Sequence, residues 1–464
     1  MSLLIVAMDN TIVNVALPSI RRDLHASLSG LQWTIDAYVI VLASLLLLSG
    51  STADRLGRRR TFQVGLLLFV AGSLLCSLAP TLGWLIAARA LQGVGGSMLN
   101  PVAMSIITNV FTDPRERARA IGVWGAVVGI SLALGPIVGG ALTQTAGWRA
   151  IFWINIPIGL AAAVLAAMFV PESRAARARR IDPIGQVLVI VALASLTYAI
   201  IEGPSAGWSS AQSIGTFLLA ALALGALVMY EPRRVDPLIE LRFFRSAPFS
   251  GATLIAISAF AGFSGFLFVN TLYLQDVRGY SALDAGLCTL PMAVAAFACS
   301  LLSGHAVGSR GPRLPLFIAG GCMLLSALVL TTLTPTTPLL LLLAVYAVFG
   351  AGFGTVNAPI TYTAVSGMPN NQAGVAAAVA STSRQVGQAL GVAVTGSILG
   401  AAAGSGIGQH LTSASHPAWW LIAGCSASVL AIGAASTGRW AQATARRCAE
   451  QLEEEPASQP LQPA

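Results

Sequence analysis

Residues 122–140 read GVWGAVVGISLALGPIVGG and contain no charged side chain. At about 1.5 Å of rise per residue, a helix over this segment crosses most of the hydrocarbon core of a bilayer. Small residues recur four apart at Ser131, Gly135 and Gly139, so a neighbouring helix backbone can approach this face closely. Pro136 removes one helical hydrogen bond and kinks the helix. The pattern therefore indicates a pivot or a site of close helix packing.

The composition excludes a soluble globular protein. Apolar residues make up 55% of the chain, charged residues 9%, and the mean hydropathy is +0.76. All basic residues other than histidine are arginines, and they lie between apolar segments, so the net charge of +8 does not indicate nucleic-acid binding. The six cysteines have no metal or disulfide spacing. We therefore expect an all-α, polytopic membrane protein without a metal site or a nucleic-acid partner.

Fourteen apolar segments are long enough to be candidate membrane spans. They are residues 2–20, 32–52, 61–79, 82–108, 119–143, 150–170, 184–201, 213–231, 248–274, 284–304, 314–333, 338–362, 374–401 and 417–437. If the N-terminus lies inside, nearly all the arginines fall in cytoplasmic loops, as the positive-inside rule expects. We therefore predict about 14 transmembrane helices with both termini cytoplasmic.

A weak internal repeat divides the chain. Residues 50–60 read GSTADRLGRRR, and residues 304–313 read GHAVGSRGPR after a corresponding apolar segment. This pattern predicts two six-helix bundles, over residues 1–170 and 247–437, with two inserted transmembrane helices and linkers over 171–246. The polar residues 438–464 are predicted to form a disordered cytoplasmic tail.

Several motifs occur in a characteristic order. They are DNTIVNVALP at residues 9–18, the 50–60 motif, RALQGVG at 89–95, the glycine-rich 122–140 segment, and a segment from Trp148–Arg149 to Gly159. Together they resemble the major facilitator superfamily, specifically its fourteen-helix branch of drug/proton antiporters. The likeness covers almost the whole chain, although Ser131 stands where the fifth-helix pattern usually has glycine.

The resemblance implies a proton-coupled antiporter that exports small lipophilic, cationic drugs or antibiotics by alternating access. It further implies a monomer in a bacterial cell (inner) membrane, driven by the proton gradient without a cofactor. No GxxxxGK[ST] phosphate loop indicates ATP binding, and no nucleophile–base pair indicates an enzyme. Two alternatives stay open: a dedicated exporter of one metabolite or antibiotic made by the host, and a proton-coupled importer, against which the 122–140 motif argues.

Two acidic residues lie within apolar segments, where an ionised side chain costs about 2.5–3.5 kcal/mol on insertion scales. Asp36 is a candidate proton site or contact for a cationic substrate, but it can also be a hydrated residue at the outer end of its helix. Asp9, in the first motif, is a candidate proton-coupling residue or a polar packing residue.

Two arginines within apolar segments can likewise have either a functional or a structural role. Arg89 shares a helix face with Gln92, and either promotes proton release from a nearby acid or forms a structural ion pair. The resemblance implies the coupling role. Arg384 either faces a central cavity or extends along its helix to the inner surface.

Two further groups of candidate residues follow from the motifs. The candidate inner gate is Gly50, Asp54, Arg55, Gly57, Arg58 and Arg59, which also fits a plain positive-inside loop. The candidate antiporter hinge is Gly122, Gly135, Pro136, Gly139 and Gly140.

Overall fold

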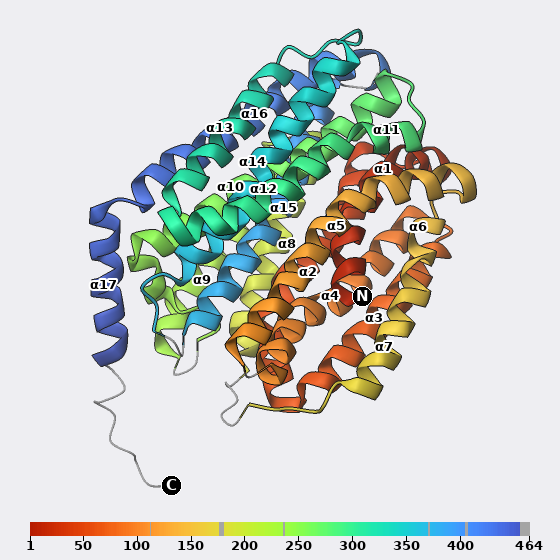
Figure 1. The fold of residues 1–464 in the computed structure, drawn as a ribbon. Coiled ribbons are helices and arrows are strands. Elements are labelled where there is room, and N and C mark those ends of the chain that lie inside the picture. The colour runs from red at the N-terminus through yellow and green to blue at the C-terminus, as the bar shows by residue number, and fades with distance from the viewer. Residues whose placement is uncertain (112, 176–180, 235–236, 370–371, 404–406, 455–464) are drawn as a thin grey trace.

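The computed structural model describes residues 1–464 except 112, 176–180, 235–236, 370–371, 404–406 and 455–464. In the described part every regular element is a helix (Figure 1). The first elements are α1 (Ser2–Leu24), α2 (Leu28–Leu56), α3 (Arg58–Ser77), α4 (Leu82–Val110), α5 (Pro114–Ala146), α6 (Ala150–Trp153) and α7 (Asn155–Phe169). Next come α8 (Pro183–Ala206), α9 (Ala211–Tyr230) and the short 3-10 turns η1 (Glu231–Arg233) and η2 (Leu241–Arg245).

The remaining elements begin with a long helix that ends in a π-helical segment. They are α10 (Ala247–Leu272), η3 (Tyr273–Val277), α11 (Ala282–Cys288), α12 (Leu290–Arg310), α13 (Arg313–Leu330), α14 (Leu339–Val365), α15 (Ala373–Ala403), α16 (Ile407–Ser436) and α17 (Arg439–Glu454). The chain is thus an all-helical membrane protein, as predicted.

Each predicted apolar segment lies on one helix or on two consecutive helices in this order. Within the described ranges, ten helical segments are long and apolar enough to cross a membrane. The count of fourteen crossings, and the cytoplasmic position of both termini, stay predictions.

Local signals explain where the helices begin and end. The side chains of Ser27 and Asp113 accept hydrogen bonds from backbone N–H groups in the first turns of α2 and α5. Pro114 and Pro183 occupy first-turn positions, where the missing N–H costs nothing. Gly57 has φ +116°, a conformation that L side chains rarely adopt, and it lets the chain turn directly from α2 into α3.

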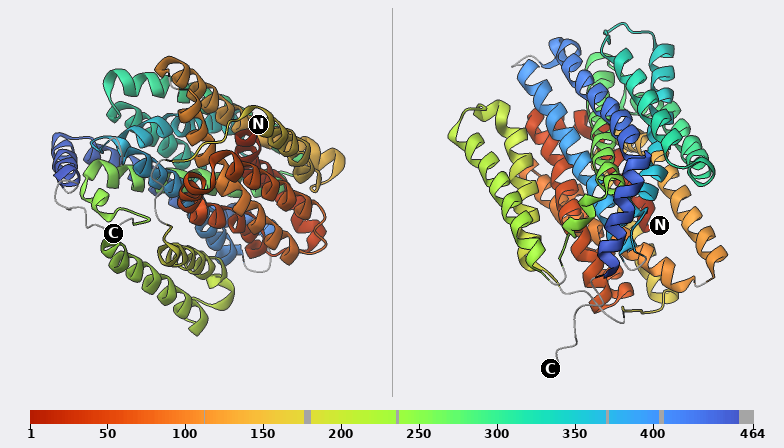
Figure 2. Two further views of the ribbon diagram at one scale, coloured as in Figure 1. Left: turned by 90° about the horizontal axis from the view of Figure 1, so that it is seen from below. Right: turned by 90° about the vertical axis from the view of Figure 1, so that its left-hand side faces the viewer.

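Two groups of helices lie side by side, coloured red to yellow and green to blue in Figure 1. In the first group α1 packs on α5, and α4 packs on α2 and α3. In the second group α10 packs on α15, α12 packs on α14, and α13 packs on α14 and α16. Helices α8 and α9 pack on each other at the edge of the molecule, and α8 also contacts α2 and α15 (Figure 2). The boundaries of the predicted bundles stay predictions.

The two groups meet closely where α5 packs on α11, at the ends predicted to face outward. A Cβ atom at Gly140 would lie 2.4 Å from the carbonyl oxygen of Ala282, and one at Gly286 would lie 2.3 Å from that of Pro136. Gly139 faces Ile12 of α1 in the same way. These positions of the 122–140 motif are therefore sites of close helix packing.

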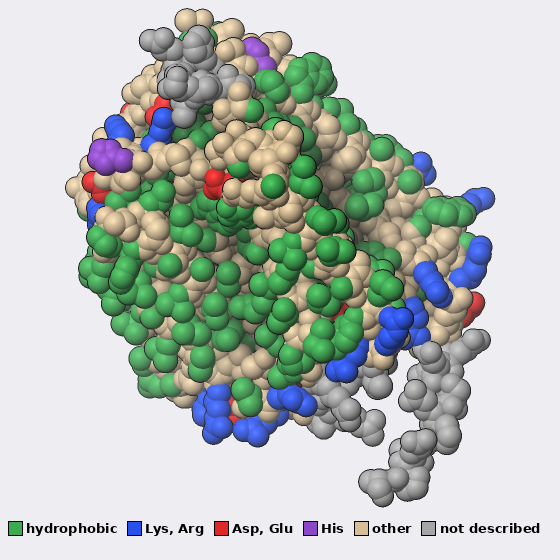
Figure 3. All heavy atoms as spheres, turned by 180° about the vertical axis from the view of Figure 1, so that it is seen from behind, with side chains coloured by type: hydrophobic (Ala, Val, Ile, Leu, Met, Phe, Trp, Pro, Cys, Tyr) green, Lys and Arg blue, Asp and Glu red, His purple; other side chains and the backbone are tan. Residues whose placement is uncertain are grey.

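The inner ends of several helices have no such neighbours. A Cβ atom at Gly50, Gly122, Gly304 or Gly308 would have no heavy atom beyond its own helix within 4 Å. Arginine side chains gather along the same end of the molecule, and hydrophobic side chains form a broad belt beside it (Figure 3). This conformation therefore combines tight outer contacts between the groups with open space at these inner positions.

The prediction of a disordered tail from residue 438 is wrong for residues 439–454, which form α17. Ala441, Ala445, Cys448 and Leu452 are buried, and their spacing of four, three and four places them on one helical face. This face packs on α10 and η2. The polar composition concealed an amphipathic helix, and residues 455–464 lie outside the described part.

The close approach of α5 and α11 leads to a prediction. We expect Gly140→Ala to destabilise the packing by about 1–3 kcal/mol, because the new methyl group must displace backbone atoms of α11. Thermal unfolding and hydrogen exchange in α11 measure the effect, and Gly122→Ala in the same motif is the matched control. Equal behaviour of the two variants would contradict the prediction.

Candidate functional site

Asp9 of α1 and Arg89 of α4 form an ion pair in the middle of the first helix group. Arg89 Nη1 donates to Asp9 Oδ2 at 2.5 Å, and the two side chains are 1% and 0% exposed. Such a pair loses its hydration completely, so it is stable only if further hydrogen bonds satisfy the remaining polar atoms.

Neighbouring side chains supply these hydrogen bonds. Gln92 Nε2 donates to Asp9 Oδ1 at 3.0 Å and to Ser73 Oγ at 2.8 Å, and Gln92 Oε1 accepts from Arg89 Nη1 at 2.7 Å. Asn155 Nδ2 donates to Asp9 Oδ1 at 3.2 Å. The network thus joins helices α1, α3, α4 and α7.

Two contacts from α2 also hold the guanidinium of Arg89. Arg89 Nε donates to the carbonyl oxygen of Thr34 on α2 at 3.0 Å, and the guanidinium carbon lies 4.3 Å from the ring centroid of Tyr38. The sequence predicted Asp9, Arg89 and Gln92 as site residues, but missed Ser73, Tyr38 and Asn155. Asn155 could have been suspected, because it is a polar residue in an apolar segment and belongs to the fifth quoted motif.

Asp36 lies apart from this network and has a different environment. It is fully buried, and within the described part of the chain neither carboxylate oxygen has a hydrogen-bond partner. Gln32, Ile40 and Ala43, which share its helix face, all lie against α15. Asp36 is therefore enclosed where α2 meets α15, and not hydrated at a helix end.

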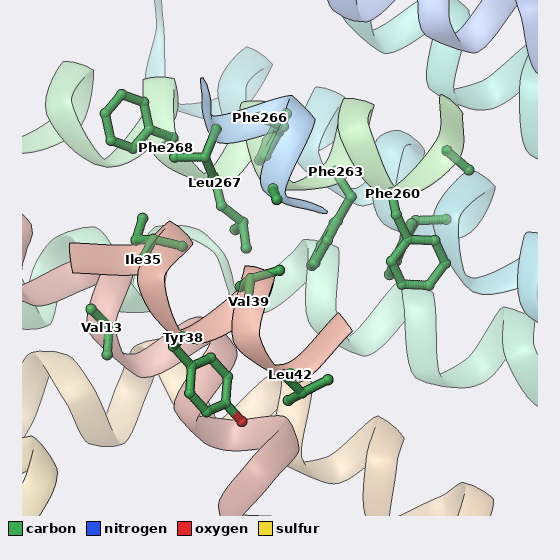
Figure 4. Close-up of a cluster of buried hydrophobic side chains, with 14 of the residues drawn as sticks. Val13, Ile35, Tyr38, Val39, Leu42, Phe260, Phe263, Phe266, Leu267 and Phe268 are labelled. Atoms are coloured by element: carbon green, nitrogen blue, oxygen red, sulfur yellow. The ribbon is translucent and has the colours of Figure 1, made fainter. Parts of the chain in front are cut away.

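The surroundings of Asp36 are mostly apolar. Figure 4 shows its neighbours Ile35 and Val39 on α2 directed toward Phe263 and Leu267 of α10. One turn toward the outer end, Gln32 Nε2 donates to the carbonyl oxygens of Val392 and Ala393 at 3.3 and 2.7 Å. We call this contact between α2 and α15, from Gln32 to Ala43, the outer seam.

Two further contacts join the groups near the outer ends of α1 and α10. Gln275 Nε2 donates to the carbonyl oxygen of Val15 at 2.8 Å, and Arg21 Nη1 lies 3.4 Å from Asp276 Oδ2. Gln275 and Asp276 belong to η3, whose π-helical geometry turns them toward α1; such segments are frequent at functional sites. The outer closure thus rests on a few polar contacts and on glycine packing.

The candidate inner gate lies at the corner between α2 and α3. Asp54 Oδ1 accepts from Arg58 Nη2 at 2.9 Å and from Arg58 Nε at 3.2 Å. The sequence missed Glu172, whose carboxylate accepts the backbone N–H groups of Arg59 and Arg60 at 3.1 and 3.3 Å. This acid stabilises the N-terminus of α3 and ties the segment after α7 to the corner. The position of Glu172 next to an arginine-rich loop was the feature of the sequence that could have identified it.

Of the other predicted gate residues, Arg59 also contacts the end of α7, because its Nη1 donates to the carbonyl oxygen of Val170 at 3.3 Å. Arg55 is exposed, and Gly50 faces open space. The contacts of Asp54 and Arg58 lie within the first helix group, so a role in closing the inner side between the groups stays a prediction.

Arg384 is brought together with none of the residues above. It is half-buried on α15, and Nη2 donates to Thr361 Oγ1 of α14 at 2.6 Å. No described carboxylate lies within 4 Å of its guanidinium. Among the described residues no group of three His, Cys, Asp or Glu side chains is arranged to hold a metal ion.

Residues 1–392 match the profile of the Major Facilitator Superfamily. The chain belongs to the major facilitator superfamily. It is therefore a multi-pass membrane transporter, and its relatives carry names of drug-resistance and export proteins.

Two of these relatives have names that refer to drug resistance or export. Over 384 residues the transporter is 37% identical to the multidrug resistance protein Stp of Mycobacterium tuberculosis (strain CDC 1551 / Oshkosh), covering 83% of this chain and 71% of the relative. Over 377 residues it is 36% identical to the tetracenomycin C resistance and export protein of Streptomyces glaucescens, covering 80% and 69%. In structure it resembles a bacterial homologue of the human lysosomal transporter Spinster, with a TM-score of 0.61, 18% identity, and 97% and 96% of the two chains covered.

The buried ion pair of this transporter leads to a prediction. We expect Asp9→Leu to destabilise the protein by about 3–5 kcal/mol, because it leaves the Arg89 guanidinium buried without its counter-charge. The double variant Asp9→Leu/Arg89→Met should recover much of the loss. Thermal unfolding in detergent measures the stability of both variants. The control is Asp276→Leu, which breaks the ion pair with Arg21, whose two side chains are 30% and 25% exposed. This control should cost about 0–1 kcal/mol of stability. A single variant at Asp9 no worse than this control would contradict the prediction.

Proposed function

We propose that this transporter exports small lipophilic drugs or antibiotics across a bacterial cell membrane in exchange for protons. The two helix groups rock against each other, so that the cargo site opens alternately to the cytosol and to the outside. The named relatives support export of drugs, and Asp36 in the outer seam is the observation that supports coupling to protons.

Asp36 supports proton coupling through its lack of partners. A negative charge enclosed in an apolar contact without hydrogen bonds is costly, and nothing in the described surroundings compensates for it. A bound proton removes this cost. The outer seam can therefore close over the protonated carboxyl group, whereas an ionised Asp36 favours a state in which water reaches it.

This dependence gives a transport cycle. When α2 and α15 separate at their outer ends, Asp36 becomes accessible from the outside and takes up a proton. A cationic cargo held by the ionised carboxylate is displaced in the same step, because proton and cargo compete for one negative charge. Closure of the seam then returns the transporter to the inward-open state, in which the proton leaves to the cytosol and the ionised carboxylate takes the next cargo. Exchange of one proton for one monovalent cation moves no net charge, so the proton concentration gradient drives it. A cargo without net charge leaves one positive charge moving inward in each cycle, for which a membrane potential of 100 mV supplies about 2.3 kcal/mol.

A second candidate function keeps this mechanism but narrows the cargo. The name of the Streptomyces relative refers to resistance to and export of one compound, tetracenomycin C, so a dedicated exporter of one host-made antibiotic is a concrete alternative. Expression in a sensitive strain separates the two. Resistance to several unrelated compounds supports a multidrug exporter, and resistance to one compound supports a dedicated exporter.

The role of Asp36 is tested in everted membrane vesicles energised to an acid interior. We expect uptake of a fluorescent lipophilic cation together with proton release. Asp36→Asn should reduce both at least tenfold, since the amide has nearly the same shape but cannot ionise. The variant should stay folded, because it removes a charge that has no partner.

Asp113→Asn is the matched control, because Asp113 is an exposed helix cap and asparagine caps helices equally well. It should transport as the parent protein does. Unchanged proton-coupled uptake by Asp36→Asn at every pH would refute the assignment of Asp36, and absence of any proton-coupled export by the folded parent protein would refute the proposed function.

A further inference from the structure

Arg384 is a charged side chain deep in α15, and the described residues offer it no counter-charge. Its Nη2 donates one hydrogen bond to the hydroxyl of Thr361. Its Nε is buried and has no hydrogen-bond partner among the described residues. Arg89, by contrast, is paired with Asp9 and donates further hydrogen bonds to Gln92 and to the carbonyl oxygen of Thr34. Because a charge at this depth is costly without a partner, the contrast between the two arginines needs an explanation.

The neighbours on α15 define the direction of the Arg384 side chain. A Cβ atom at Gly387 or Gly391 would touch carbonyl oxygens of α10, so this face packs on α10. Val386 and Ala389 lie against Ile40 and Leu193, so the adjoining face packs on α2 and α8. Successive residues of a helix are rotated by 100°, so Arg384 and Gln388 lie next to the face formed by Gly387 and Gly391, which packs on α10. They lie on the side of that face that points away from α8. This flank faces the space between the two helix groups.

Further unused polar atoms accompany Arg384 on α15. The side-chain oxygens of Thr382, Gln385 and Gln388 are buried, and the described residues offer them no hydrogen-bond donor. Gln388, one turn from Arg384, lies on the same flank of α15, whereas Gln385 and Thr382 lie about 100° and 200° around the helix from it. Buried polar atoms in proteins normally have a partner, so the unsatisfied oxygen of Gln388 beside Arg384 indicates a surface that binds a polar molecule. Its charge is positive, and the Gln388 oxygen can accept hydrogen bonds from hydroxyl or amine groups.

Asp36 and Arg384 lie on facing helices at different depths. Helices α2 and α15 are antiparallel, with Gln32 beside Val392–Ala393 and Ile40 near Ala389, so Asp36 lies opposite residues close to Leu390. Arg384 then lies roughly 9 Å further toward the inner end, at 1.5 Å per residue. This separation is within the length of a drug-sized molecule.

We propose that Arg384 binds an acidic oxygen group of the cargo, such as a carboxylate or an ionised phenol, and that the exported compounds are amphoteric. The inference rests on the proposed export function, in which Asp36 takes the basic nitrogen of the same cargo. Arg384 then supplies the second, opposite charge. A guanidinium suits this role because it binds oxyanions through two parallel N–H groups.

The test measures binding to the purified full-length protein without a proton gradient. The probes are matched pairs of fluorescent xanthene dyes, each pair consisting of a zwitterion with a free carboxylate and its cationic methyl ester. We expect the parent protein to bind the zwitterion of at least one pair at least about tenfold more tightly than the ester. Arg384→Gln should remove this preference by weakening zwitterion binding alone, and Arg384→Lys should retain part of it.

The matched control is Arg310→Gln, an exposed arginine at the end of α12, which should leave the preference unchanged. Nanodiscs of phosphatidylcholine exclude anionic lipid, and added phosphatidylglycerol tests whether a lipid headgroup is the partner instead. Loss of the preference only when this lipid is added would assign Arg384 to lipid and overturn the proposal.

Three other results would also overturn the proposal. The first is equal binding of zwitterion and ester by the parent protein in every pair. The second is an equal weakening of the binding of both dyes in Arg384→Gln, and the third is an Arg384→Gln variant that keeps the preference of the parent protein for the zwitterion. These outcomes are independent of proton coupling. A protein that keeps the dye preference but shows no proton-driven uptake would refute the proposed function and not the binding role of Arg384.

Discussion

The buried ion pair between Asp9 and Arg89 is the constraint on which the first helix group depends. A guanidinium and a carboxylate without hydration require partners for every polar atom, and these partners come from different helices, Ser73 on α3 and Asn155 on α7 among them. Each helix must therefore hold its depth and rotation relative to the others. The network makes this group a rigid unit that can move as a whole, which alternating access requires.

The contacts between the helix groups are of a different kind. Gln32 and Gln275 donate side-chain hydrogen bonds to backbone carbonyl oxygens, and Arg21 and Asp276 form a pair that is partly exposed. Such contacts are individually worth about 1 kcal/mol, and glycine packing between α5 and α11 adds apolar contact without interlocking side chains. Strong pairing within a group and weak pairing between groups allow the outer side to open without unfolding either group.

The sequence was sufficient for the positions of the helices, because long apolar segments in a membrane protein have few alternatives to a helix. It also placed Arg89 and Gln92 on one face, because that follows from helical spacing. It did not predict that Ser73 and Asn155 complete the network, because their contacts depend on how separate helices are rotated. Nor did it predict α17, since the apolar face formed by Ala441, Ala445, Cys448 and Leu452 is small and its composition is polar.

The distinction between paired and unpaired charges connects the structure to transport. A charge that serves only the fold is best satisfied permanently, as Arg89 is by Asp9. A charge that binds and releases a mobile partner must lack a permanent one, and Asp36 on α2 and Arg384 on α15 have no counter-charge in the described part of the chain. Because they lie on the facing helices α2 and α15, the movement that separates the outer seam also changes the distance between them. A cargo that engages both charges is therefore bound most tightly in one conformation, and that difference in affinity is what lets binding drive the transition.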